Sequence, residues 1–225
     1  MKHFIFLLMM VAGVSNAYGE AMTQQKPQTL LAMSGFKLEA TRLTDSVLVI
    51  VDAQREYVDG KLPLDGIDTS VKEASLLLER ARKAGTPVIH VIHKGKAGGA
   101  LFNPDGPSFK IINSLAPKPN ENIIKKALPN AFTGTNLEEM LTRLGRKNQI
   151  VIGYMPHMCV SSTVRAAIDR GYRTTIVAKA TAPRDLPAPA GGGVVSAQAL
   201  QSASLAALAD RFAAVVQKFR NSQVG

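Results

Sequence analysis

Three side chains suited to nucleophilic chemistry follow three separate apolar runs of the chain. Asp52 comes directly after SVLVIV, Lys126 ends NIIKK, and Cys159 follows NQIVIGY within the stretch GYMPHMCVSSTVRAA. A cysteine becomes a strong nucleophile when its thiol loses the proton, and a neighbouring carboxylate or ammonium group influences that step. A thiol, a carboxylate and an ammonium group therefore suit attack on a carbonyl carbon, provided that the fold brings them together.

Cys159 is the single cysteine among the 225 residues, so it has no partner for an intrachain disulfide. A lone buried cysteine commonly behaves as a small hydrophobic residue. In an exported protein, however, an unpaired thiol is exposed to an oxidising compartment. The position of Cys159 at the predicted start of a helix also favours a thiolate, through the backbone N–H groups and the helix dipole. We therefore interpret Cys159 as a functional residue.

The first residues indicate export. Met1-Lys2-His3 precedes the apolar run FIFLLMMVAGV, and small residues follow in SNAYGEA. This pattern is typical of a cleaved signal peptide, and the run is shorter than the roughly 20 residues that span a bilayer. We predict a signal peptide at 1–19, an N-terminal extension at 20–42 and a single domain at 43–225. The mature protein is expected to be periplasmic or secreted, without stable membrane insertion after processing.

The formal net charge is +10, but the basic residues are scattered among acidic ones and aromatic residues are few. This distribution lacks the basic stripe of a nucleic-acid-binding surface, so we predict no nucleic-acid partner. An anionic substrate or an envelope surface fits the excess charge better.

Short apolar runs alternate with longer amphipathic ones, which predicts a three-layer α/β/α sandwich with a mostly parallel, about six-stranded Rossmann-like sheet. Ligands bind beyond the carboxyl ends of the strands in such sheets, so Asp52, Lys126 and Cys159 should meet at one edge. The expected strands are 46–52, 86–93, 122–126, 148–154, 172–179 and 212–217. The expected helices are 68–85, capped by Asp68 or Thr69, then 135–145, 156–171 and a segment near 196–210.

VDAQREY, KALPNAF and GYMPHMCVSSTVRAA, in this order, resemble the isochorismatase-like cysteine hydrolases, a superfamily that includes nicotinamidases and N-carbamoylsarcosine amidases. The resemblance covers about residues 43 to 217. It implies a catalytic triad of Asp52, Lys126 and Cys159, and an oxyanion hole formed by the backbone N–H groups of Met155 and Cys159. It also implies a cis peptide bond between Tyr154 and Met155.

The implied reaction is hydrolysis of a small amide-type C–N bond through a thioester. Asp52 would accept the thiol proton, Lys126 would hold the aspartate and favour the thiolate, and Cys159 would attack the carbonyl carbon. One departure from the family pattern is Pro156, where relatives usually have threonine. Proline removes only its own N–H, so the proposed oxyanion donors are retained.

A second departure concerns metal binding, because DGKLPLDGID lacks the histidines of the nicotinamidase metal site. His90 and His93 are three residues apart on a predicted strand, and should therefore point to opposite faces. We predict neither a metal site nor a cofactor. A small amide-like substrate and a homo-oligomeric state are expected from the resemblance.

The substrate pocket is predicted at the loops 57–66, 94–120 and 183–193. Its candidate lining residues are Tyr57, Phe102, Phe132, Tyr154 and His157. The glycines at 191–193 are interpreted as a flexible loop at the pocket edge, with anion binding as the alternative.

Two other functions stay open on the same fold. The first is hydrolysis of a vinyl ether by the aspartate, as in isochorismatases, which act without this sulfur. The second is a non-catalytic thiol redox or small-molecule-binding protein, although a redox protein needs a resolving thiol that this chain lacks.

Overall fold

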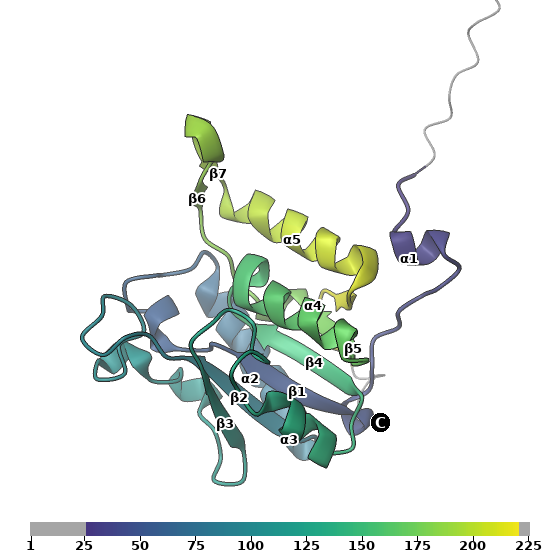
Figure 1. Cartoon of the computed structure of the whole chain (residues 1–225), viewed down its shortest axis with the longest axis horizontal. Coiled ribbons are helices and arrows are strands. Elements are labelled where there is room, and N and C mark those ends of the chain that lie inside the picture. Colours follow the sequence, from purple (N-terminus) through teal and green to yellow (C-terminus); the bar gives the residue numbers. More distant parts are fainter. Residues whose placement is uncertain (1–25, 221–225) are drawn as a thin grey trace, which may run out of the picture.

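A six-stranded sheet forms the centre of the molecule (Figure 1). The computed structural model describes residues 26–220, so the predicted signal peptide and its cleavage site lie outside the described residues. Every strand pair in this sheet is parallel, and the strand order is β3-β2-β1-β4-β5-β8. The strands are β1 (Ser46–Val51), β2 (Val88–His93), β3 (Asn122–Lys126), β4 (Asn148–Gly153), β5 (Arg173–Val177) and β8 (Ala214–Val216). The predicted sheet is confirmed.

Helices cover both faces of the sheet, which completes the three layers. Leu77 and Leu78 of α2 (Ile67–Lys83) pack with Leu48 and Ile50 on one face. On the other face, the core combines α3 (Leu137–Arg143) and α4 (Ser161–Asp169) with the valines at 47, 49 and 51 of β1. Helix α5 (Ala197–Arg211) lies over α4 (Figure 1). Because both faces of the sheet are buried, β1 is apolar throughout after its first residue.

Two helix starts differ from the sequence-based expectation. The predicted caps Asp68 and Thr69 of the first long helix are wrong, because the N-cap is Gly66 in a left-handed conformation without a side-chain cap. The helix that carries Cys159 begins with a π-helical turn, Pro156–Val160, before α4. Local sequence signals favoured an ordinary first turn with proline at its start. The wider turn places the sulfur one turn ahead of α4.

The two loops that were expected to be long contain short ordered elements. Residues 94–120 include the turns Pro107–Phe109 and Asn113–Leu115 and a bridge between Gln54 and Ile111. Residues 183–195 form a small hairpin from β6 (Leu186–Pro187) and β7 (Val194–Val195), which projects beyond α5 (Figure 1). Glycines 191 and 193, both with positive φ, make its turn.

The N-terminal part of the described chain contacts α5. Helix α1 (Leu30–Met33) packs against α5, and the backbone N–H of Leu30 donates to Asp210 at 2.7 Å. None of the helices within residues 26–220 has the length and apolar character needed to cross a membrane.

Candidate active site

The three chemically reactive residues meet at the carboxyl edge of the sheet. Asp52 directly follows β1, Lys126 is the last residue of β3, and Cys159 lies in the π-helical turn after β4. Asp52 has a φ of 51°, and its backbone N–H donates to the Val91 carbonyl of β2 at 2.7 Å. This left-handed residue ends β1 and turns the carboxylate into the site, because Asp tolerates that conformation better than most residues.

Lys126 joins the other two groups. Its Nζ lies 2.7 Å from Asp52 Oδ2 and donates to Cys159 Sγ at 3.3 Å. The side chains of Lys126 and Asp52 are fully buried, and Cys159 is 4 % exposed. A buried ammonium group therefore contacts a carboxylate and a sulfur at the same time, and the charge of each acid–base partner depends on the others.

The surroundings favour a neutral thiol at rest. Burial, followed by the charge of Asp52, raises the pKa of Cys159 to about 12, against the opposing effect of Lys126. Burial also raises the pKa of Asp52, although Lys126 works in the other direction. Desolvation of the sulfur thus outweighs the nearby cation and the helix start, which favour the thiolate. A carboxylate with a raised pKa is in turn a stronger base for the thiol proton.

The chain takes a constrained path between β4 and Cys159. Gly153 has a φ of 111°, and a Cβ at this position would overlap the carbonyl oxygen of Val51. The peptide bond between Tyr154 and Met155 is cis. The Met155 carbonyl then accepts hydrogen bonds from Met158 at 3.0 Å and Val160 at 3.2 Å. Among the described residues, the backbone N–H of Met155 has no hydrogen bond to the loops or turns, and that of Cys159 has none beyond its own helical turn.

The predicted aromatic lining divides into two groups. Tyr57 meets Phe102 and Tyr154 edge to face, at ring-centre distances of 5.3 and 5.6 Å. All three rings are buried, and Ser70 donates a hydrogen bond to the hydroxyl of Tyr154. Phe132 lies apart from this group, since its ring stacks on Tyr172 in the core on the α3–α4 face.

His157 and Arg184 add a titratable and a cationic side chain to the electrostatics of this region. His157 precedes Cys159 by two residues, and both of its ring nitrogens are buried without a hydrogen-bond partner among the described residues. Burial, followed by the charge of Arg184, lowers the pKa of His157. The same guanidinium acts on Tyr57, whose pKa is raised chiefly by burial and by Asp52. Arg184 therefore adds a positive charge that acts on residues around the site besides the triad.

The sequence reasoning missed three residues that support the site. The Gln54 side chain bonds both backbone groups of His93, donating to the carbonyl at 3.0 Å and accepting from the N–H at 2.8 Å. The Glu56 carboxylate accepts from the backbone of Lys61 and Phe102. His93 itself lies 3.2 Å from Lys126 Nζ. Gln54 and Glu56 stand within VDAQREY. Polar residues that directly follow a buried strand could have indicated side chains that bind backbone groups around the site.

His90 and His93 point to opposite faces of β2. His90 Nε2 lies 2.9 Å from Glu121, whose carboxylate also binds Arg82, whereas His93 faces Lys126. Among the residues that the structure describes, no cluster of histidine, cysteine, aspartate or glutamate could hold a metal ion.

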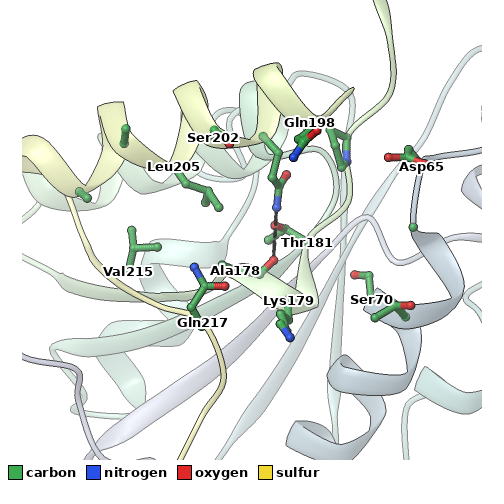
Figure 2. A pocket seen from close by; sticks show the side chains of 16 residues that line it. Asp65, Ser70, Ala178, Lys179, Thr181, Gln198, Ser202, Leu205, Val215 and Gln217 are labelled. Atoms are coloured by element: carbon green, nitrogen blue, oxygen red, sulfur yellow. Dashed lines mark hydrogen bonds between the residues drawn. The ribbon is translucent and has the colours of Figure 1, made fainter. Parts of the chain in front are cut away.

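A cavity of about 720 Å³ lies beside α5, away from the triad. Figure 2 shows Gln198, Ser202 and Leu205 of α5 on one side of it, with Thr181 and Gln217 opposite. A hydrogen bond of 2.8 Å from Gln201 to Thr181 closes one part of this wall. None of the triad residues lines this cavity. The N-terminus of α5 does not offer a free anion site, because Ser196 and Asp185 accept from the N–H groups of Ala199 and Ala197.

The family model and the related proteins found by sequence comparison point to the same family. The family model described as Isochorismatase domain matches residues 46–218. The secreted isochorismatase effector Isc1 of Verticillium dahliae is 40% identical over 185 residues, which is 82% of this chain and 94% of that protein. Streptothricin hydrolase of Streptomyces noursei is 33% identical over 144 residues, covering 64% of this chain and 57% of that enzyme.

The fold comparison agrees. The crystal structure of an isochorismatase from Pseudomonas putida KT2440 has a TM-score of 0.81 and 43% sequence identity, and the match covers 84% of this chain and 96% of that chain. The parallel six-stranded sheet and the family match over most of the chain lead to one conclusion: this protein belongs to the isochorismatase family of hydrolases.

Proposed function

We propose that this protein is an exported cysteine hydrolase that cleaves a small amide-type C–N bond through a thioester on Cys159. The observation that carries the proposal is the position of Lys126 Nζ, 2.7 Å from the Asp52 carboxylate and 3.3 Å from the sulfur. An amidase needs a nucleophile, a proton acceptor and a group that keeps both in place, and these three side chains supply those parts.

The first half of the reaction forms the thioester. As Cys159 Sγ attacks the carbonyl carbon, its proton moves to Asp52, and the carbonyl electron pair moves to oxygen. The C–N bond then breaks, the oxygen regains its double bond, and the proton on Asp52 passes to the departing nitrogen. Ammonia or an amine leaves, and the acyl group remains on sulfur.

The second half releases the acid. Asp52, again a carboxylate, takes a proton from water while the water oxygen attacks the thioester carbon. The C–S bond breaks, and the sulfur leaves as a thiolate that recovers the proton from Asp52. Lys126 keeps its proton throughout and stabilises the negative charge as it moves between Asp52 and Cys159.

The oxyanion is assigned to the backbone N–H groups of Met155 and Cys159. The position of both residues directly after β4, at the sheet edge that carries Asp52 and Lys126, supports this assignment. Donors that are fixed before the reaction stabilise the developing negative charge without reorganisation.

The charge around the site favours a substrate with an anionic or strongly polar end. The charge of Arg184 acts on both Tyr57 and His157, and the Arg184 Nε is buried without a hydrogen-bond partner among the described residues. A buried guanidinium N–H costs free energy until a ligand satisfies it. Similarity to streptothricin hydrolase supports amide chemistry.

Vinyl ether hydrolysis is the second candidate, because the chain is 40% identical to a protein described as an isochorismatase. That reaction would use Asp52 and would leave the sulfur without a role. The contacts of Lys126 with Cys159 favour the amidase.

Export is part of the proposal, supported by the N-terminal sequence and by similarity to a secreted relative. Mass spectrometry of the protein from the envelope or medium should find an N-terminus between residues 18 and 22. An intact Met1 on the active protein would contradict export.

The test of function is a screen with the wild type and Cys159→Ala that measures ammonia released from small primary amides and ureides, ring-opened amine from lactams, and hydrolysis of isochorismate. Under the amidase proposal, at least one compound should yield ammonia or an amine with the wild type and none with the variant. Hydrolysis of isochorismate alone, at equal rates in both proteins, would replace it with the vinyl ether reaction.

A further inference from the structure

The Lys126 ammonium group has one more partner than the proposed mechanism uses. An ammonium group carries three N–H donors and no acceptor. Nζ forms an ion pair with Asp52 Oδ2 at 2.7 Å and donates to Cys159 Sγ at 3.3 Å, and His93 Nδ1 lies within hydrogen-bond distance at 3.2 Å. The three contacts match the number of N–H groups. Because the Lys126 side chain is fully buried, an N–H without a partner would leave its desolvation uncompensated.

The chemistry of this contact determines the state of the imidazole. Since the ammonium group only donates, His93 Nδ1 must accept, and the ring is therefore neutral with its proton on Nε2. Burial, followed by the charge of Lys126, lowers the pKa of His93 to about 4, so the ring stays neutral at neutral pH.

The surrounding structure fixes the ring in place. His93 is the last residue of β2 and pairs with Lys126 of β3 in the sheet register. The Gln54 amide holds the His93 backbone from the other side, with bonds of 3.0 and 2.8 Å. The Phe102 ring meets the imidazole edge to face, with ring centres 5.0 Å apart. The sheet register, the Gln54 bonds and the Phe102 ring together hold Nδ1 against Nζ.

We propose that His93 is a positioning residue, whose Nδ1 accepts the third hydrogen of Lys126 and holds Nζ between Asp52 and Cys159. Its effect on turnover rests on the proposed function, but the contact itself exists without substrate. Loss of the acceptor leaves one N–H of Nζ unpaired, and allows Nζ to move away from the sulfur.

Two substitutions separate this role from packing. His93→Asn keeps an acceptor near the position of Nδ1 but loses the ring, whereas His93→Phe keeps a ring against Phe102 but loses the acceptor. His90→Asn is the matched control, because His90 lies on the same strand, faces Glu121 and is remote from Lys126. It reports the effect of losing a buried histidine from β2 without touching the site.

The readout is the rate at which chloroacetamide alkylates Cys159 at pH 7.5, followed by intact mass spectrometry of proteins whose folding is verified by circular dichroism. An acceptor role predicts that His93→Phe lowers this rate about tenfold, the equivalent of one lost hydrogen bond, while His93→Asn and His90→Asn stay close to the wild type. A wild-type rate in folded His93→Phe, or an equal loss in His93→Asn, would overturn the proposal.

Nitrogen-15 NMR of the wild type supplies a second test that does not depend on the variants folding. At pH 6.5, His93 should be neutral with its proton on Nε2, and a proton on Nδ1 would overturn the proposal. Neither measurement needs a substrate, so a failed ammonia screen would count against the proposed function and leave this inference standing.

Discussion

Removal of both charges from the buried pair of Asp52 and Lys126 should cost clearly less stability than the two single removals added together. At 2.7 Å and an effective dielectric constant of 20, two unit charges attract by about 6 kcal/mol, and desolvation of both ions offsets much of this. When one partner is removed, the other remains as an uncompensated buried charge, at a cost of about 3–5 kcal/mol.

The perturbation is a double-mutant cycle of Asp52→Asn, Lys126→Met and the double variant. Asn suits the left-handed backbone at position 52, so Asp52→Asn changes charge without a new backbone conflict. We expect each single change to lower the free energy of unfolding by about 3–5 kcal/mol, and the double change to cost at least about 2 kcal/mol less than their sum. Urea unfolding at pH 7 measures all four proteins.

Lower pH should partly restore the stability of the Lys126→Met variant. Without the cation, burial raises the pKa of Asp52 in the folded variant above its value in the unfolded chain. The folded variant is therefore most stable at low pH, where the carboxyl is protonated, and loses this stability as the pH rises through the folded pKa. The control is Arg143→Met at an exposed pair with Glu139, which should cost less than about 1 kcal/mol. Additive single effects, or a Lys126→Met variant as stable as the wild type, would refute the assignment of a buried ion pair.

Three further predictions concern other parts of the chain. Asp52→Asn should speed alkylation of Cys159 by iodoacetamide at pH 8 and yet abolish amide turnover, because the Asp52 charge raises the thiol pKa; slower labelling would contradict this. Gly153→Ala should prevent folding or strongly lower the melting temperature, since its Cβ would overlap the Val51 carbonyl, whereas Gly145→Ala, which meets open space, should cost about 1 kcal/mol; equal melting temperatures would be the contrary result. Burial opposes ionisation of Glu121, but bonds from Arg82, Lys118 and His90 lower its pKa to about 2, so stability should fall as pH drops from 4.5 toward 2; Glu121→Gln should flatten that part of the urea-midpoint profile, and an unchanged slope would count against the network.

The architecture could be predicted because buried parallel strands are apolar on both faces and leave a strong signal. SVLVIVD and NQIVIGY became β1 and β4, and residues at their carboxyl ends met in space as the general rule for such sheets requires. The meeting of Asp52, Lys126 and Cys159 at one edge could therefore be predicted from sequence order and residue type.

The supporting contacts could not be predicted in the same way. His93 was correctly placed on the face opposite His90, but nothing in its spacing indicates that Nδ1 meets Lys126. Phe132 carried the same sequence signal as Phe102, yet tertiary packing took it to Tyr172. The start of α2 at Gly66 depends on a left-handed turn, which competed with the better capping residues that follow.

The charge states of the site residues were the hardest feature to predict from the sequence, because they depend on burial. The helix start and Lys126 favour a thiolate whereas burial and Asp52 oppose it, and only the buried geometry decides the balance, with the pKa of Cys159 raised to about 12. The thiol is therefore expected to lose its proton during attack and not before it.

The central claim is that Cys159 carries the acyl group during turnover. The most direct measurement is rapid acid quench of the enzyme mixed with p-nitrophenyl acetate, followed by mass spectrometry of the tryptic peptide 148–165, which contains Cys159. We expect one acetyl group on the Cys159 sulfur that forms and decays with turnover, and neither adduct nor turnover in Cys159→Ala. Wild-type turnover in Cys159→Ala, without an adduct on this peptide in either protein, would contradict it.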